Sequence, residues 1–238
     1  MPIKPTLFVV TDIETTLKHR IAFDIAWRTV DRAGRVYDRG SYVIRESFKL
    51  DVPYFREKMG HYFDDAFNRL IQPASITEVQ QAYNDSITRL KGEGHRVIPC
   101  AYNAAFDFKY LPETLQKLTD NPQARWLNQP VELLDIWHYW GLSVPLAYRA
   151  DLSASGKFYK TSAEAAYRYE FLESDFVERH MAWHDCEIEA RILCKTLARK
   201  KALPVVKSPR DFVGGVYRLI NNRLGVDGKT QLEGVIAA

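Results

Sequence analysis

Short apolar segments typical of β-strands alternate along this chain with longer segments whose apolar residues recur at helical spacing. The first, residues 6–11, contains the run Leu-Phe-Val-Val, which is typical of a central strand buried on both faces. Residues 21–30 and 36–44 are rich in strand-forming residues and flank Asp-Arg-Ala-Gly at 31–34, where Asp and Gly favour a tight reversal. The sequence therefore predicts three successive strands, the last two forming a hairpin.

The rest of the chain continues this alternation. Ser75 and Glu78 have the spacing of a capping box, which marks the start of a helix. The elements expected after the hairpin are a helix over 59–71, a helix from Ser75 to Gly92, a strand over 96–101, a helix over 106–118, a strand over 131–136, a helix capped by Thr161 and Glu164 and ending near Phe171, a helix over 181–197 and a helix over 212–222. This order predicts an α/β fold with a mixed sheet.

Composition limits the class of protein. The 238 residues are 46% hydrophobic, enough for one substantial core, and Pro and Gly become frequent after Ala202. We therefore expect a main domain over 1–202 and a C-terminal appendage of unknown role over 203–238. Since no run approaches the roughly 18 apolar residues that span a bilayer, and no signal peptide is recognisable, we expect a cytoplasmic protein with no membrane association. The three cysteines lack C-x-x-C spacing, which indicates reduced thiols.

Acidic residues follow two of the expected strands. Asp12 and Glu14 stand two residues apart at the end of the first strand, so both side chains can face one side and share a metal ion. Asp107 follows the strand over 96–101, where a strand-to-helix turn would place it beside the end of the first strand. Ordinary explanations exist as well: an exposed acidic pair at Asp12 and Glu14, a helix N-cap at Asn103 and a first-turn acid at Asp107.

A third acid lies on the inner face of the last long helix. Asp185 follows His180 by five positions. Histidine has an ordinary pKa near 6.5 and can take a proton from water near neutral pH. Taken singly, His180 would be a surface residue and Asp185 a buried acid paired with an arginine. His180, His184 and Cys186 could also be imagined as a zinc site, although a fourth ligand at suitable spacing is missing.

The three segments together resemble a known group of enzymes. Thr-Asp-Ile-Glu-Thr-Thr at 11–16, Ala-Tyr-Asn-Ala-Ala-Phe-Asp at 101–107 and His-Met-Ala-Trp-His-Asp at 180–185 are similar to the motifs of the DEDD exonuclease superfamily. The histidine five positions before the last acid resembles its DEDDh branch, the DnaQ-like 3′→5′ exonucleases; the second branch would have tyrosine where this chain has Met181. The resemblance covers residues 7–197 and implies a ribonuclease H-like fold with a five-stranded mixed β-sheet flanked by α-helices.

The resemblance also implies a role for each residue. Asp12 would bridge two divalent cations, Mg²⁺ or Mn²⁺, Glu14 and Asp185 would complete the shell of one, and Asp107 would hold the second largely through water. His180 would be the general base. Two such ions stabilise charge on the attacking and leaving oxygens of a phosphodiester. The expected activity is hydrolysis from the 3′ end of nucleic acid, which releases nucleoside monophosphates.

By the same resemblance, a few residues would hold the terminal nucleotide: Thr15, Thr16 and Leu17 on one side and Asn103 and Phe106 on the opposite side. The family has a glycine soon after its first acidic motif, and this chain does not. Further contacts are left open: Trp137, Tyr139 and Trp140 would either stack bases or fill the core, and the basic run Arg199-Lys200-Lys201 would either bind phosphates or end a helix in solvent.

Substrate and partners are only partly indicated. A partner nucleic acid with a free 3′ end is expected, and single-stranded DNA is favoured. RNA stays an alternative because no motif reports a contact to the 2′-hydroxyl. The sequence is also compatible with a catalytically silent nucleic-acid-binding module and with an endonuclease of the same fold. It indicates neither a protein partner nor an oligomeric state.

Overall fold

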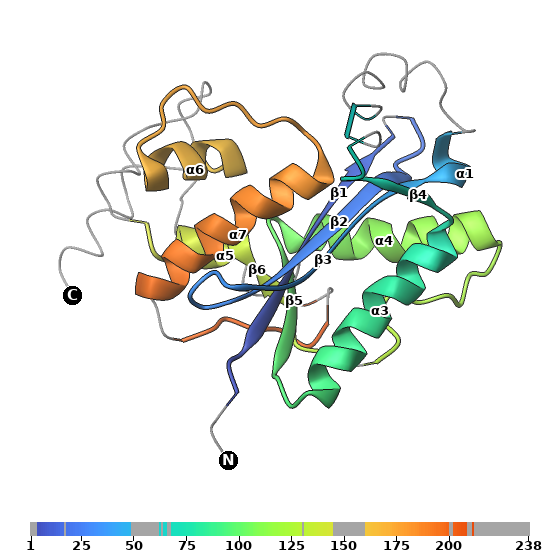
Figure 1. The fold of residues 1–238 in the computed structure, drawn as a ribbon, viewed down its shortest axis with the longest axis horizontal. Coiled ribbons are helices and arrows are strands. Elements are labelled where there is room, and N and C mark those ends of the chain that lie inside the picture. Colours follow the sequence, from blue (N-terminus) through green and yellow to red (C-terminus); the bar gives the residue numbers. More distant parts are fainter. Residues whose placement is uncertain are drawn as a thin grey trace.

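The computed structural model describes residues 4–16, 18–48, 62, 64–65, 68–129, 131–144, 160–199, 202–208 and 211. Their strands form one sheet in the order β4-β3-β2-β1-β5-β6, with helices on both faces (Figure 1). The strands are β1 (Leu7–Thr15), β2 (Ala22–Asp31), β3 (Val36–Ile44), β4 (Gln72–Ala74), β5 (Val97–Ala101) and β6 (Leu134–Asp135). The helices are α1 (Arg45–Phe48), α3 (Ile76–Gly92), α4 (Ala104–Thr119), α5 (Ile136–Gly141), α6 (Ala163–Phe171) and α7 (Ala182–Arg199).

The sheet is mixed. β1 pairs antiparallel with β2 and parallel with β5, β2 pairs antiparallel with β3, and β5 pairs parallel with β6. This arrangement confirms the predicted α/β class and hairpin and is consistent with a ribonuclease H-like fold. The sixth strand, β4, was not predicted: it has three residues, pairs with the end of β3 and contains Pro73, which an edge strand tolerates.

The two faces of β1 belong to different cores. Leu7, Val9 and Ile13 pack with α3 and α4, whereas Phe8 and Val10 pack with α5, α6 and α7. Figure 1 shows the same division, with α3 and α4 on one side of the sheet and α5, α6 and α7 on the opposite side. Side chains alternate along a strand. Asp12 and Glu14 continue the alternation of Phe8 and Val10. Their side chains therefore point toward the α7 side.

Local capping explains where the helices begin. The capping box of Ser75 and Glu78 at α3 is confirmed. At α6 the predicted cap is wrong by one residue: Ser162, not Thr161, is the N-cap, because its extended backbone lets the hydroxyl accept from the N–H of Ala165. Glu164 instead accepts from the N–H of Glu178 at 2.9 Å.

The strand predicted over 131–136 is shorter than expected. Asp135 accepts from the N–H of His138 at 2.9 Å and so starts α5 at Ile136. Tyr139 and Trp140 are fully buried in the core, so the base-stacking alternative is wrong for both. Trp137 is partly exposed.

Parts of the C-terminal prediction lie outside the described residues. Val206 forms an antiparallel bridge with Leu133, beside β6. The helix expected over 212–222 lies outside the described ranges. Of the one expected over 59–71, the described residues 62, 64 and 65 are helical, residues 68–71 form turns and bends, and the rest lie outside the described ranges. No helix in the part of the chain that the structure describes has both the length and the apolarity to cross a bilayer.

Candidate active site

Three elements bring the predicted acids to one end of the sheet. Asp12 and Glu14 lie near the end of β1, Asp107 is in the first turn of α4, and Asp185 is in the first turn of α7. Asp107 is 2% exposed, and the backbone of Ile13, the residue between Asp12 and Glu14, lies close enough to its carboxyl to lower the pKa of that group against the larger rise from burial. The start of α4 is therefore fixed against the strand that carries the first two acids.

A second contact sets the position of α7. The N–H of Ala182, the first residue of the helix, donates to Asp24 Oδ2 at 3.0 Å, and Asp24 is the register partner of Glu14. Cys186 is buried, with its sulfur 3.3 Å from Ala26 O and 3.5 Å from Val10 O. Both contacts hold the first turns of α7 over β1 and β2.

Three side chains form a group that could hold a metal ion. The residues are Glu14, His180 and Asp185. Each offers one ligand atom, and these three atoms lie within 4.8 Å of one another. His180 Nδ1 is 4.0 Å from Glu14 Oε1, and the His180 side chain is 64% exposed. Asp185 Oδ1 is buried without a hydrogen-bond partner among the described residues, although His184 Nδ1 is 3.5 Å away. Hard oxygen ligands with an unsatisfied buried carboxylate oxygen fit a divalent cation.

Asp12 and Asp107 are electrostatically coupled to this group. Burial raises the pKa of Asp12 well above its ordinary value, and the charges of Glu189, Asp107, Asp185 and Glu14 raise it further. Burial also raises the pKa of Asp107, with hydrogen bonds from the backbone opposing that shift. Carboxylates this close repel one another, so a bound cation would stabilise their charged forms.

Two further acids near the site were missed by sequence reasoning. Glu189 is 3% exposed, accepts from the N–H of Tyr102 at 3.4 Å, and burial followed by the charge of Asp107 raises its pKa well above the ordinary value. Burial and the charge of Asp185 raise the pKa of Glu178 to about 7. Glu189 follows Asp185 by four residues, a helical spacing that predicts a shared face.

Backbone geometry at the helix starts is unusual. Asn103 at the N-cap of α4 has φ 65°, and its side chain makes no capping hydrogen bond, so the capping explanation for this side chain is wrong. Asp135 takes over part of that function, because its Oδ2 accepts from the N–H of Ala104 at 3.1 Å. His180, just before α7, has φ 53°. Both residues occupy the left-handed region, where non-glycine residues are uncommon.

The residues predicted to contact the terminal nucleotide differ in how far they are buried. Thr16 is fully buried: its N–H donates to Ile21 O, and its hydroxyl accepts from the N–H of Ile21. Thr15 is partly exposed and Leu17 lies outside the described residues. Asn103 is exposed, and Phe106 packs edge-on against Tyr110 with ring centroids 4.7 Å apart.

One interpretation of the sequence is wrong, and one alternative for the basic run is confirmed at Arg199. The sulfur of Cys186 faces backbone carbonyls of β1 and β2, and the metal-ligand group among the described residues contains no cysteine, which contradicts the zinc site. Arg199 is the exposed last residue of α7, as the helix-end alternative predicted, whereas Lys200 and Lys201 lie outside the described residues. Arg199 also donates to the buried carboxylate of Glu170 at 2.6 and 2.7 Å. Its guanidinium therefore anchors α7 to α6.

Comparisons with known proteins find a likeness to solved structures alone. No protein-family model matches this sequence, and no curated protein is detectably similar to it. Among solved structures, the chain is similar to E. coli exonuclease I in complex with a dA16 oligonucleotide, with 13% identity and a TM-score of 0.48 over 82% of this chain. The match covers 41% of that protein, so this chain spans less than half of its length. At this identity the likeness concerns the fold alone.

Proposed function

We propose that the protein is a metal-dependent 3′→5′ exonuclease of the DEDDh type, which hydrolyses single-stranded DNA to nucleoside monophosphates. The observation that carries the proposal is the group of Glu14, His180 and Asp185, whose ligand atoms lie within 4.8 Å of one another beside two coupled acids, Asp12 and Asp107. Taken singly, these residues have ordinary explanations. Together they would supply oxygen ligands and a base at one end of the sheet.

Each residue has a distinct part in the proposed reaction. Asp12, Glu14 and Asp185 would hold one Mg²⁺ or Mn²⁺, and Asp12 and Asp107 the second. When bound, these cations would supply positive charge to the attacking and leaving oxygens of the phosphodiester. His180 is exposed enough to meet solvent, and its imidazole would accept a proton from the attacking water. Water forms the new bond to phosphorus, and the bond from phosphorus to the 3′-oxygen of the preceding nucleotide breaks.

The surrounding residues support this geometry without touching the substrate. Asp24 fixes the start of α7, and with it Asp185, by accepting from Ala182. Glu189 links α7 to the loop before α4 through the N–H of Tyr102. Positioning of this kind matters because small displacements of reacting groups lower rates strongly.

A labelled-strand assay tests the proposal. Linear single-stranded DNA and RNA with a 5′ label are incubated with Mg²⁺, Mn²⁺ or EDTA, using the wild type and Asp185→Asn. Stepwise shortening from the 3′ end that requires metal and Asp185 supports an exonuclease, and the faster substrate identifies the sugar preference. Binding without shortening would instead indicate a silent module. Cleavage of circular single-stranded DNA would indicate an endonuclease.

A further inference from the structure

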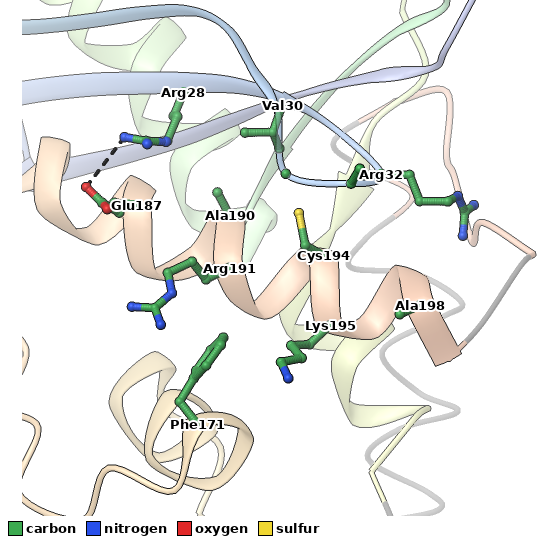
Figure 2. Close-up of a pocket in the computed structure, with 12 residues that line it drawn as sticks. Arg28, Val30, Arg32, Phe171, Glu187, Ala190, Arg191, Cys194, Lys195 and Ala198 are labelled. Carbon is green, nitrogen blue, oxygen red and sulfur yellow. Dashed lines mark hydrogen bonds and ion pairs between the residues drawn. The ribbon is translucent and has the colours of Figure 1, made fainter.

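A groove with a volume of about 410 Å³ lies on the outer side of α7, away from the candidate active site. Figure 2 shows it between the β2–β3 turn, α7 and the end of α6. Four of its lining residues are cations and one is an acid: Arg28, Arg32, Arg191, Lys195 and Glu187. Val30 and Ala190 make part of its surface apolar.

The positive charge of this groove is only partly compensated. Arg28 Nη1 lies 3.4 Å from Glu187 Oε2, and Arg32 donates to the carbonyl of Leu197 at 2.5 Å. No carboxylate lies within 4.0 Å of Lys195 or Arg191 in the described part of the chain. The lining therefore keeps an excess of positive charge.

The aromatic ring in the groove is already covered. The Arg191 guanidinium lies 4.3 Å from the centroid of the Phe171 ring, and Lys195 Nζ lies 5.4 Å from the same centroid. Arg191 also donates a hydrogen bond to the Tyr167 hydroxyl. These contacts hold the cations against the ring where a base would otherwise stack, so the groove favours phosphate contacts over stacking.

The groove shares α7 with the candidate active site, and it is lined by β2, the strand that pairs with β1. Arg28 is two residues along β2 from Ala26, the register partner of Asp12. The α7 residues that line the groove run from Glu187 to Ala198, about 16 Å of helix at 1.5 Å per residue. Because they face away from Asp185, a strand bound here would be held at a part remote from its terminal nucleotide.

From these observations we infer that the groove binds backbone phosphates of a nucleic-acid strand whose 3′ end occupies the candidate active site. The inference rests on the proposed function for the placement of that end. Lysine and arginine neutralise phosphates without reading sequence. The groove would therefore increase affinity for long strands and leave dinucleotide-sized substrates unaffected.

The test compares two charge reversals in the non-cleaving Asp185→Asn background. Lys195→Glu lies in the groove, and Lys91→Glu, near the end of α3 on the opposite side of the sheet, is the matched control. Binding of a fluorescent 20-nucleotide single-stranded DNA is measured at several salt concentrations. We expect Lys195→Glu to weaken binding roughly tenfold and to reduce the salt slope by about one, and Lys91→Glu to change neither. Lys195→Gln, a milder change, is expected to weaken binding about threefold.

Each outcome separates this inference from the proposed function. Circular dichroism first shows whether the Lys195 variants are folded. If folded variants bind DNA as the wild type does at every salt concentration, the inferred phosphate site is wrong, even if the wild type shortens DNA. If the wild type never shortens a strand but the Lys195 variants bind DNA more weakly, the nuclease proposal is overturned and the phosphate site is supported. If a polyglutamate peptide binds in a Lys195-dependent way and the oligonucleotide does not, the groove is a protein-docking surface and the inference is wrong.

Discussion

The two faces of α7 carry opposite charges in opposite environments: buried acids on the inner face and exposed basic residues on the outer face. The inner face carries Asp185 and Glu189, both about 3% exposed, beside Asp12 and Asp107. The outer face carries Arg191 and Lys195, which are exposed. Buried charges of one sign raise one another's energy, whereas solvated charges barely interact. On the proposals above, one helix would separate a region that gains stability from cations and a region that attracts anions.

The largest expected effect is the loss of an inner-face acid. Asp185→Asn keeps the shape of the side chain and removes its charge, so nuclease activity should fall about a thousandfold. Rates of 3′-end shortening with Mn²⁺ provide the measurement. Asp85→Asn, at an exposed position of α3, is the control and should keep full activity. Equal rates in both variants would remove Asp185 from the mechanism.

Replacing His180 should have the next largest effect. Because His180 is the proposed base, His180→Ala should lower activity about a hundredfold at pH 8. Wild-type activity should rise from pH 6 to 8, and the variant should lose that rise. Calorimetric titration of His180→Ala with Mn²⁺ separates two roles of His180. If His180 is the base, the variant keeps its affinity for Mn²⁺; if His180 is a metal ligand, the variant loses affinity. A flat wild-type profile with an active variant would sink the proposed role.

Cations should stabilise the inner face. At a Mn²⁺ concentration one hundred times the dissociation constant, one site adds about 2.7 kcal/mol to the free energy of unfolding. Thermal unfolding with Mn²⁺ or EDTA measures this difference, and Asp185→Asn should abolish most of it. Lys91→Glu serves as the control. An equal rise in melting temperature in wild type and Asp185→Asn would place the cation elsewhere.

Without metal, stability should decline as pH rises. Asp12, Asp107 and Glu189 have raised pKa values, so the folded state keeps protons that the unfolded chain releases above the ordinary values of 3.8 to 4.5. Each such group stabilises the fold at low pH, and its contribution is lost as pH rises through the folded pKa. Burial lowers the pKa of His138 to about 4, which opposes the trend below pH 6.5.

Urea unfolding in EDTA between pH 6.5 and 8.5 therefore isolates the acids. Asp185→Asn should show a shallower decline, because one repelling charge is gone. Lys195→Gln on the outer face should follow the wild type. A decline of the same slope in all three proteins would show that the inner-face acids do not set this pH dependence.

The smallest expected effect lies on the outer face. The Arg28 and Glu187 side chains are 27% and 44% exposed and 3.4 Å apart. Their coupling in a double-mutant cycle of Arg28→Gln and Glu187→Gln should be below about 0.5 kcal/mol in free energy of unfolding. A coupling of several kcal/mol would mean that the groove is less hydrated than its exposure indicates.

Local patterns were sufficient for much of the fold. The β2–β3 hairpin and the capping box of Ser75 and Glu78 depend on neighbours in sequence, and both are confirmed. The end of β5 at Ala101 was predicted, whereas β1 runs four residues beyond its predicted end at Thr11, so Asp12 and Glu14 lie within the strand. The acids of β1 and the first turn of α4 were nevertheless expected to lie near one another.

What was missed depends on contacts between distant residues. Asp24 holds the start of α7 across 158 positions, and no local pattern distinguishes it from the remaining acids in strands. Asp135 joins the starts of α4 and α5 in the same way. Glu189 did carry a signal, its four-residue spacing from Asp185. The three residues of β4 have little strand character of their own, and the strand forms because it pairs with β3. Its sequence therefore gave no signal.

The left-handed backbone at His180 has an evolutionary consequence. At φ 53° a histidine is strained relative to glycine, which adopts this region without a steric cost. A directed-evolution screen for heat resistance alone would therefore favour glycine at this position and discard the imidazole. Engineers who select this protein for thermal tolerance would need to score turnover in every round, because the variants that survive heating best would include ones without the proposed base.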